Sequence, residues 1–311
     1  MPDSLDPRAA GSRHANPTAL PSDAPPTEPP LVHIVIVNWN GATQTLRCIA
    51  ALRNLTYPNF RIVVVDNGSA DDSVDVIRHQ APDVALLVSS HNLGFAGGNN
   101  LGIRHALEAH ADFVWLLNND TVVDPHSLDG MVQEAASDER IGIVGSRLYF
   151  MKEPERLQAY GGGTVSFRTG STHHVRTRVP DEKLDYITGA SMLISSRLAE
   201  AIGLLDDSYF FYWEDADYCL RARKAGWRLV VAPQSKVWHD VAASVRGGSP
   251  QQYYLFATNS VRFFQRHAPH AWASILVGSS KRLIKRLALL DFTGASSIVR
   301  GLRDGFAQRQ G

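Results

Sequence analysis

The sequence predicts an α/β fold built on a Rossmann-like, mostly parallel central sheet with helices on both faces. Apolar segments rich in β-branched residues alternate with amphipathic helical segments, at a spacing typical of such a sheet. The first of them, residues 31–37, reads LVHIVIV and has the composition of a strand buried on both faces. Polar clusters follow the ends of successive strands, where parallel α/β sheets bind their ligands. We therefore expect a ligand site along the carboxyl edge of the sheet.

The expected elements follow from the same patterns. Strands are expected at the short apolar runs, namely residues 31–37, 60–65, 84–88, 113–117, 141–145, 192–194, 228–232 and 236–239. Helices are expected where apolar residues recur every three or four positions, namely residues 42–56, 71–77, 99–110, 199–202, 214–225 and much of 253–311. The glycines at 161–163 open a stretch, to about residue 187, that predicts hairpins inserted into this frame.

The composition is that of a globular protein with two domains, or with one large α/β domain and an appendage. Basic and acidic residues number 31 each, so no overall field would attract nucleic acid. Cys48 and Cys219 each fall in an expected helix and are expected to be buried free thiols of a reducing compartment. No signal peptide and no transmembrane run stand out. We expect a cytoplasmic protein, and leave open a peripheral position at the inner face of the plasma membrane.

The segment FFYWEDADYCLRARKAGW, residues 210–227, combines an aromatic stretch with three acids. Glu214, Asp215 and Asp217 fall in the first turn of the expected helix, and Gly226 stands where that helix would end. Acids in a first turn suit the helix dipole and need no functional role. Alternatively, burial beside aromatic side chains raises one carboxyl pKa and makes a general base. The segment alone leaves both interpretations open.

Five motifs follow one another along the chain: IVNWNG (36–41), VVVDNGSADDS (63–73), NLGFAGGNN (92–100), LLNNDT (116–121) and FYWEDADYCLRARKAGW (211–227). With this ordered set on its strand–helix frame, the chain resembles the inverting glycosyltransferases of family 2, which have the fold called GT-A. The resemblance points to the bacterial rhamnosyltransferase-like members.

The resemblance implies one catalytic domain between two appended segments. The glycosyltransferase domain would cover residues 31–265, with a nucleotide-sugar half at about 31–125 and an acceptor half at about 140–265. Residues 1–30 are rich in Pro, Ser, Asp and Ala, which predicts a disordered leader. Residues 266–311 would form a basic amphipathic helical segment.

The implied donor site lies at the ends of the first strands. In this family the Asp that closes the second strand binds the nucleotide base, and here that residue is Asp66. A carboxylate that accepts from the imide N–H of a pyrimidine fits uridine or thymidine. Asp66 also suits a turn with Asn67 and Gly68, and both roles are compatible. The residues implied at the nucleotide sugar are Asn38, Asn40, Asp66, Asn92, Gly98, Asn99, Asn119 and Asp120.

Residues 118–120, Asn-Asn-Asp, stand where the family has its Asp-X-Asp metal motif, and the first acid is replaced by Asn118. One carboxylate suffices for Mg²⁺ or Mn²⁺ on a diphosphate, because phosphate oxygens and water supply other ligands. The resemblance therefore implies Asp120 as a metal ligand of weakened affinity. His239 matches the family's distal His and is the implied second ligand, with a structural role as the alternative.

By the same resemblance, Asp215 is the catalytic base, and Glu214 orients the acceptor or the base. The stretch TGAS (188–191) lies where the family shapes the acceptor side, which implies Gly189 and Ala190 there. Trp213 is either a platform on which the acceptor sugar stacks or a buried core aromatic.

The implied reaction moves a sugar, with L-rhamnose from dTDP-rhamnose as the expected donor, to a hydroxyl of a cell-surface glycan or a polyprenyl-linked acceptor. The alternatives are another dTDP- or UDP-hexose donor, or a module that binds a nucleotide sugar without catalysis. A dinucleotide-dependent dehydrogenase is disfavoured, because the loop NWNG lacks the G-x-G-x-x-G fingerprint.

The C-terminal segment places four basic residues, Lys281, Arg282, Lys285 and Arg286, among leucines and isoleucine. This pattern predicts a basic amphipathic helix. Such a helix either lies on a membrane surface or packs on the catalytic domain with its charges in solvent.

Overall fold

The computed structural model describes residues 28–240 and 248–308, so nearly all of the expected leader lies outside the described residues. Within them, nine strands form one sheet in the order β3-β2-β1-β4-β11-β6-β12-β5, with β7 paired to β6. These strands are β1 (Val32–Asn38), β2 (Phe60–Asp66), β3 (Ala85–Val88), β4 (Phe113–Asn118), β5 (Thr121–Val123), β6 (Ile141–Phe150), β7 (Glu153–Tyr160), β11 (Ser191–Ser195) and β12 (Arg228–His239).

The first half of the sheet is the expected parallel block. β1 pairs in parallel with β2 and β4, and β2 pairs in parallel with β3. The register sets Asn38 beside Asp66 at the carboxyl ends of β1 and β2. The second half is mixed, because β11 runs antiparallel to both β4 and β6, whereas β12 runs parallel to β6. β11 therefore joins the predicted donor edge to the other half of the molecule.

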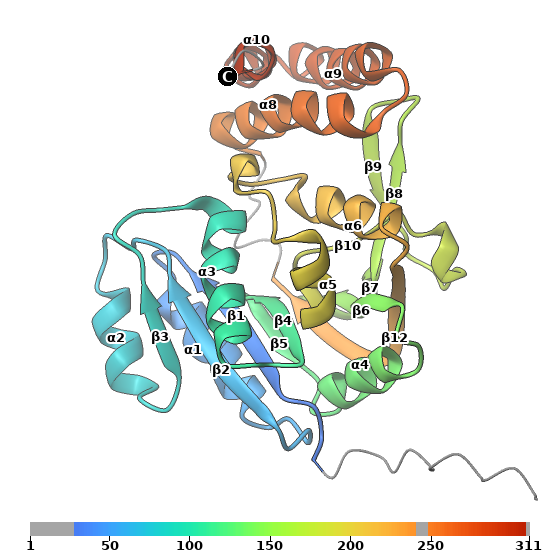
Figure 1. The fold of residues 1–311 in the computed structure, drawn as a ribbon. Helices are drawn as coiled ribbons and strands as arrows, with labels where there is room; N and C mark the ends of the chain where they lie inside the picture. The colour runs from blue at the N-terminus through green and yellow to red at the C-terminus, as the bar shows by residue number, and fades with distance from the viewer. Residues whose placement is uncertain (1–27, 241–247, 309–311) are drawn as a thin grey trace, which may run out of the picture.

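Helices cover both faces of the sheet, as predicted (Figure 1). They are α1 (Ala42–Leu52), α2 (Ser73–Gln80), α3 (Gly94–Glu108), α4 (Ser127–Ala136), α5 (Ser196–Ile202) and α6 (Glu214–Lys224). Alternate residues of β1 enter different cores, as the period of a strand requires. Ile34 and Ile36 lie in the cluster that contains buried residues of α1 and α2, and Val35 lies in the cluster that contains those of α3 and α6.

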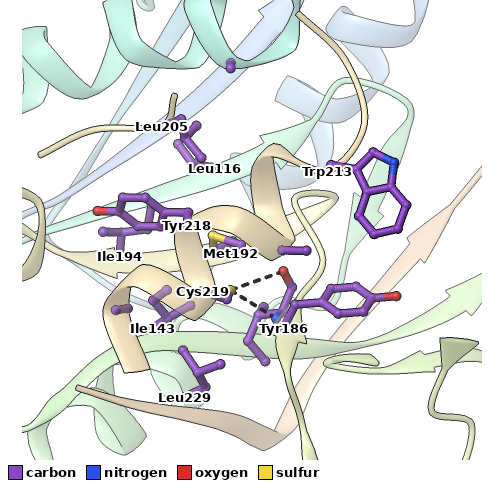
Figure 2. Close-up of a cluster of buried hydrophobic side chains, with 14 of the residues drawn as sticks. Leu116, Ile143, Tyr186, Met192, Ile194, Leu205, Trp213, Tyr218, Cys219 and Leu229 are labelled. Carbon is purple, nitrogen blue, oxygen red and sulfur yellow. Dashed lines mark hydrogen bonds between the residues drawn. The ribbon is translucent and has the colours of Figure 1, made fainter. Parts of the chain in front are cut away.

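Both cysteines are buried free thiols, as predicted. Burial raises the pKa of the Cys48 thiol to about 12, and burial likewise raises the pKa of Cys219. The sulfur of Cys219 accepts a hydrogen bond from the backbone N–H of Ile187 at 3.3 Å. Figure 2 shows Cys219 and Tyr218 of α6 above the sheet, close to Met192 of β11. This packing fixes α6, and with it the acidic segment at its N-terminus.

Several elements differ from the sequence-based expectation. β5, α4 and β7 were not expected, α1 ends at Leu52 and not at residue 56, and β6 continues to Phe150. Helix α3 begins at Gly94 and not at Asn99. α3 lies close to β1, and glycines permit this approach: an added Cβ would stand 3.0 Å from Val37 Cγ1 at Gly98, and 2.2 Å from Val35 Cγ1 at Gly102 further along the helix. The two short strands expected at 228–232 and 236–239 form the single strand β12, with a register shift between Ala232 and Lys236.

The predicted hairpin insertion is a three-stranded sheet of β8 (Gly162–Ser166), β9 (Ser171–His174) and β10 (Tyr186–Ile187). Short 3₁₀ helices η1 (Asp181–Lys183) and η2 (Asp207–Tyr209) lie in the loops before β10 and α6. The C-terminal helices are α8 (Pro250–His267), α9 (Ala271–Ala288) and α10 (Phe292–Ala307), and they form a layer at the end of the molecule away from β3 and α2 (Figure 1). Among the described helices, none combines the length and apolar character that crossing a membrane requires.

Candidate active site

The ends of β1 and β2 are joined by a buried polar network. Asn38 donates from Nδ2 to Asp66 Oδ2 at 2.8 Å, and Ser69 donates its hydroxyl to the same oxygen at 2.6 Å. The other oxygen, Oδ1, accepts from the backbone N–H of Ser69 at 3.0 Å, which is the turn role considered for Asp66. Asp66 is fully buried. Its carboxylate therefore rigidifies the floor of the site, and its contact with a nucleotide base stays a prediction.

Two further predicted donor residues, Asn40 and Asn119, border this floor. Asn40 has φ +50° and accepts from the backbone N–H of Ala70 at 2.8 Å, which ties the loop after β1 to the loop after β2. Asn119 donates to the Thr45 hydroxyl at 3.1 Å, and Thr45 donates to Asn38 Oδ1 at 2.7 Å. Thr45, which the sequence did not single out, thus links the ends of β1 and β4.

The NLGFAGGNN segment is held to the floor by Asn67. Its amide donates to Asn92 Oδ1 at 3.1 Å and to the Gly94 carbonyl at 2.9 Å, and accepts from the Leu93 N–H at 3.0 Å. Gly98 also borders this amide, because an added Cβ would lie 3.2 Å from Asn67 Nδ2. The neighbouring Asn99 is buried and donates to the Phe95 carbonyl of its own helix at 2.9 Å. These hydrogen bonds, from Asn67 and within the segment itself, fix the conformation of the NLGFAGGNN segment. Asn92, at the start of the segment, is half-buried.

A large aromatic side chain that the sequence reasoning passed over lies at the edge of this floor. Trp39 follows the buried Asn38 and is 56% exposed. An exposed indole beside a polar floor offers a flat apolar surface of the kind on which nucleobases stack. Trp39 lies within the IVNWNG motif, so the sequence alone could have indicated it as a binding residue.

Asp120 and His239 come together although 119 positions separate them in the chain, because β5 pairs with the end of β12. His239 Nε2 lies 3.2 Å from Asp120 Oδ1, and both side chains are nearly buried. Asn118, in the position of the missing acid, places its Nδ2 at 3.3 Å from the same ring nitrogen. No group of three His, Cys, Asp or Glu side chains suited to a metal occurs in residues 28–240 and 248–308.

Gln158 of β7 orients the imidazole of His239. Its Oε1 lies 3.2 Å from Nδ1, so we assign the ring proton to Nδ1. Nε2 is then an acceptor within reach of both Asn118 Nδ2 and Asp120 Oδ1. A cation shared by Nε2 and Asp120 Oδ1 would offset the repulsion between these two acceptor atoms. The arrangement matches a metal-binding His held by an outer partner, and the sequence carried no sign of Gln158.

The acid pair stands at the start of α6, after two residues in the left-handed region. Tyr212 has φ +74° and Trp213 has φ +78°, conformations that bulky residues adopt only when their surroundings impose them. Asp215 accepts from the backbone N–H of Gly189 at 3.1 Å and of Ala216 at 2.7 Å. Glu214 is buried and its Oε2 has no hydrogen-bond partner among the described residues.

The surroundings of Glu214 and Asp215 raise the pKa values of the two carboxyl groups to different extents. Burial, and then the charge of Asp215, raises the pKa of Glu214 well above its ordinary value. Burial also raises the pKa of Asp215, although the two backbone N–H groups oppose this effect. Glu214 therefore holds a proton more readily than Asp215. Asp215 is thus the better candidate of the two for a general base.

Trp213 lies in the core, which is the alternative left open by the sequence. It is 4% exposed, and its ring centroid lies 4.6 Å from that of Phe263 and 5.0 Å from that of Phe256 on α8. Asp217 is likewise occupied by the fold: it pairs with Arg221, Arg266 and His267, whose contacts lower its pKa despite its burial.

Asn259 of α8 holds the strained loop in place. Its amide Nδ2 donates to the carbonyls of Tyr209 at 3.3 Å, Phe211 at 2.8 Å and Tyr212 at 3.3 Å. Sequence reasoning assigned Asn259 no role. Since these carbonyls precede Trp213, Asn259 fixes the backbone that presents the acid pair.

We expect Asn259→Ala to destabilise the fold by about 1–3 kcal/mol, because buried carbonyls lose their donor. Activity should fall further than the lost folded fraction explains, since the acids lose their position. Denaturant unfolding and assay of the same samples measure both effects. Thr258→Val is the control, because Thr258 bonds only within its own helix, to the Tyr254 carbonyl. Equal activity in the two variants would contradict this role.

The stretch 188–191 joins the metal-side residues to the acids. The Ala190 carbonyl accepts from the backbone N–H of Asn118 at 3.1 Å, and Gly189 binds Asp215. An added Cβ at Gly189 would stand 3.0 Å from the Phe95 ring, so the donor loop also meets this point. Burial lowers the pKa of His174, and the charge of Asp215 raises it. Residues 188–191 thus connect the predicted donor, metal and acceptor residues.

Comparisons with known proteins agree with this geometry. Residues 29–253 match the family model described as glycosyltransferase like family 2. A Mycobacterium tuberculosis N-acetylglucosaminyl-diphospho-decaprenol L-rhamnosyltransferase is 25% identical over 77% of this chain and 85% of its own length. A Haloferax volcanii hexosyltransferase of low-salt glycan biosynthesis, Agl10, is 26% identical over 61% of each chain, so the match spans less than two thirds of that relative.

Solved structures share the fold. A Pyrobaculum calidifontis mannosyltransferase, in complex with GDP-mannose and Mn²⁺, superposes with a TM-score of 0.57 at 19% identity, covering 91% of this chain and 76% of its own. GalNAc-T7, solved with UDP, GalNAc and Mn²⁺, gives a TM-score of 0.65 at 14% identity, covering 91% and 57%. The parallel block, the antiparallel β11 and the acid-bearing α6 therefore form a GT-A glycosyltransferase fold, and the chain belongs to glycosyltransferase family 2.

Proposed function

We propose that this glycosyltransferase moves a sugar, with inversion, from a pyrimidine nucleotide sugar to a hydroxyl of a glycan or polyprenyl-linked acceptor. The observation that carries the proposal is the position of Asp215, whose carboxylate accepts from two backbone N–H groups beside the buried Glu214, a carboxyl with a strongly raised pKa. The acceptor oxygen attacks the anomeric carbon, its proton passes to the Asp215 carboxylate, and the bond to the diphosphate breaks. The nucleoside diphosphate leaves on the opposite side.

The donor end would use the floor formed by β1, β2 and the start of α3. Asp66 would accept from the pyrimidine imide N–H, and the exposed Trp39 would stack on the ring. Asn92 and the backbone around Gly98 would border the sugar phosphate. The name of the mycobacterial relative supports L-rhamnose from dTDP-rhamnose as the donor, and another dTDP- or UDP-hexose is the alternative.

Asp120 and His239 would hold a divalent cation, with the donor diphosphate and water as further ligands. The cation would neutralise the charge that develops on the departing diphosphate. The two facing acceptor atoms fit such an ion. Mg²⁺ prefers oxygen ligands alone, so a carboxylate combined with an imidazole favours Mn²⁺ over Mg²⁺. Both structural neighbours were solved with Mn²⁺, which supports the same choice.

Gln158→Leu should raise the Mn²⁺ concentration for half-maximal activity about 10–100-fold, because His239 loses the partner that fixes its ring. The maximal rate at saturating Mn²⁺ should change much less. Gln158→Glu keeps an acceptor oxygen at this position and serves as the matched control. A leucine variant with an unchanged Mn²⁺ titration would contradict the orienting role.

A thermal-shift panel tests the donor class. We expect dTDP-rhamnose or a UDP-hexose to raise the melting temperature in the presence of Mn²⁺, because ligand at about 100 times its Kd stabilises the folded state by about 2.7 kcal/mol. GDP-mannose is the purine control. Stabilisation by GDP-mannose alone would contradict the pyrimidine assignment. A shift without turnover would favour the non-catalytic module, which Asn118 in place of an acid keeps as the second candidate.

A further inference from the structure

The outer face of α9 and its turn into α10 carry exposed apolar side chains. Six of them define what we name the apolar ridge: Leu276, Ile284, Leu287, Leu289, Leu290 and Phe292. Leu290 is 74% exposed, and Ile284 and Phe292 are each 65% exposed. Single exposed leucines are common on protein surfaces, but here four exposed apolar residues lie within residues 287–292. Exposed apolar side chains that cluster in this way are typical of interaction sites.

The ridge is exposed because the opposite face of α9 is committed to the fold. Gly278 packs on Gly170 in the turn between β8 and β9, where an added Cβ would stand 2.4 Å from the Gly170 carbonyl oxygen. Arg282 donates to that carbonyl at 2.8 Å and lies over the Phe256 ring at 4.3 Å. Arg286 donates to the Tyr253 hydroxyl at 2.6 Å.

Two of the four basic residues expected at the surface therefore face the protein, and the apolar residues face outward. Burial lowers the pKa of Arg282 to about 10, which reflects its place inside this contact. Lys281 and Lys285 remain exposed and border the ridge. α9 thus presents to the outside an apolar stripe with a lysine edge, the pattern of a helix that lies in a membrane interface.

The charge of the C-terminal helical layer indicates which kind of partner would bind the apolar ridge. Residues 271–308 contain six Lys or Arg and two acids, whereas the whole chain is balanced. Both acids are paired with arginine: Asp291 with Arg286 at 3.5 Å and Asp304 with Arg303 at 2.9 Å. A second copy of the chain would bring two lysine edges together across the ridge, whereas an anionic surface complements them.

We propose that the apolar ridge docks on an anionic phospholipid surface, with Leu290 and Phe292 inserted and Lys281 and Lys285 on the headgroups. Insertion to about 5–10 Å is typical of such helices. The C-terminal layer is in direct contact with the acid-bearing loop, since Asn259 and Phe256 of α8 hold Trp213 and its neighbours. Docking there would bring a polyprenyl-linked acceptor to Asp215, a consequence that rests on the proposed function; lipid binding itself does not.

Vesicle co-sedimentation of the full chain, without donor or metal, tests the proposal. Wild type should bind vesicles of phosphatidylcholine with phosphatidylglycerol and bind pure phosphatidylcholine more weakly. Leu290→Ser/Phe292→Ser should weaken binding to the mixed vesicles about tenfold or more, because two large apolar side chains no longer enter the interface. Lys281→Gln/Lys285→Gln should weaken it about tenfold, with the remaining binding less sensitive to salt.

Val88→Ser is the control, because Val88 is 53% exposed on the edge strand β3 and should bind like wild type. All changed side chains are at the surface, and unchanged melting temperatures would show that the variants fold. Absence of vesicle binding by wild type, or equal loss in the control, would overturn the proposal. A wild-type dimer in solution that Leu290→Ser/Phe292→Ser dissociates would assign the ridge to a second copy instead. Sugar transfer to a water-soluble acceptor would be unaffected by these outcomes, so the proposed function is tested separately.

Discussion

Asp215→Asn is expected to lower the rate of sugar transfer about 10²–10⁴-fold, the contribution typical of a positioned general base. Gly189 donates to Oδ2 and Ala216 donates to Oδ1, so asparagine keeps the size of the side chain and one of these two acceptor oxygens. It cannot take the proton of the acceptor hydroxyl. Donor binding should be retained, because the donor floor lies on β1, β2 and α3. Initial rates and thermal shifts with the donor on the same protein separate the two properties.

Glu214→Gln is the matched control, since an amide resembles the protonated carboxyl that burial and the Asp215 charge favour there. Its loss of rate should be at least about tenfold smaller than that of Asp215→Asn. The rate of wild type should fall as pH decreases through the raised pKa of Asp215, at a higher pH than for an ordinary aspartate. A large loss in Glu214→Gln with near-normal transfer by Asp215→Asn would exchange the two roles.

Asp120→Ala is expected to reduce transfer on the order of 10²–10³-fold at fixed Mn²⁺, as when an enzyme loses one electrostatic contact to a developing charge. The alanine leaves His239 as the remaining protein ligand of the proposed pair. Excess Mn²⁺ should restore part of the rate, because diphosphate oxygens still bind the ion. A Mn²⁺ titration of the rate measures both effects.

Asn118→Asp adds a carboxylate to the proposed metal site, whereas Asp120→Ala removes one. It supplies the acid of the family motif, with its side chain next to His239. We expect half-maximal activity at a lower Mn²⁺ concentration than in wild type. If Asp120→Ala were as active as wild type after chelation of all divalent ions, the metal assignment would fail.

The parallel half of the fold was predictable because both faces of its strands are buried, so β1 and β2 are nearly continuous apolar runs. The start of α3 was not, because glycine signals a loop locally, while here Gly98 lies within the helix and packs closely on Val37. The break after Ala232 likewise ended the expected strand, although β12 continues beyond a register shift. Local composition reports neither the distance between two elements nor the tolerance of a strand for an irregularity.

The resemblance named the acids and the predicted metal pair, and in the structure residues 188–191 connect them. Their supporting partners were out of reach, because Gln158 and Asn259 act through contacts with residues 81 and about 50 positions away. An isolated Gln or Asn carries no pattern that would show such a role. For Trp213 the motif left two roles open, a sugar platform and a core aromatic, and its packing on α8 makes it part of the core.

The most direct measurement is release of nucleoside diphosphate from dTDP- and UDP-sugars by the wild-type protein, with Mn²⁺, with a chelator, and in Asp215→Asn. The account predicts release from at least one pyrimidine nucleotide sugar in the presence of an acceptor extract. That release should require Mn²⁺ and should be lost in Asp215→Asn. Release that persists in both the chelated and the Asp215→Asn samples would contradict a metal-assisted transferase with Asp215 as its base.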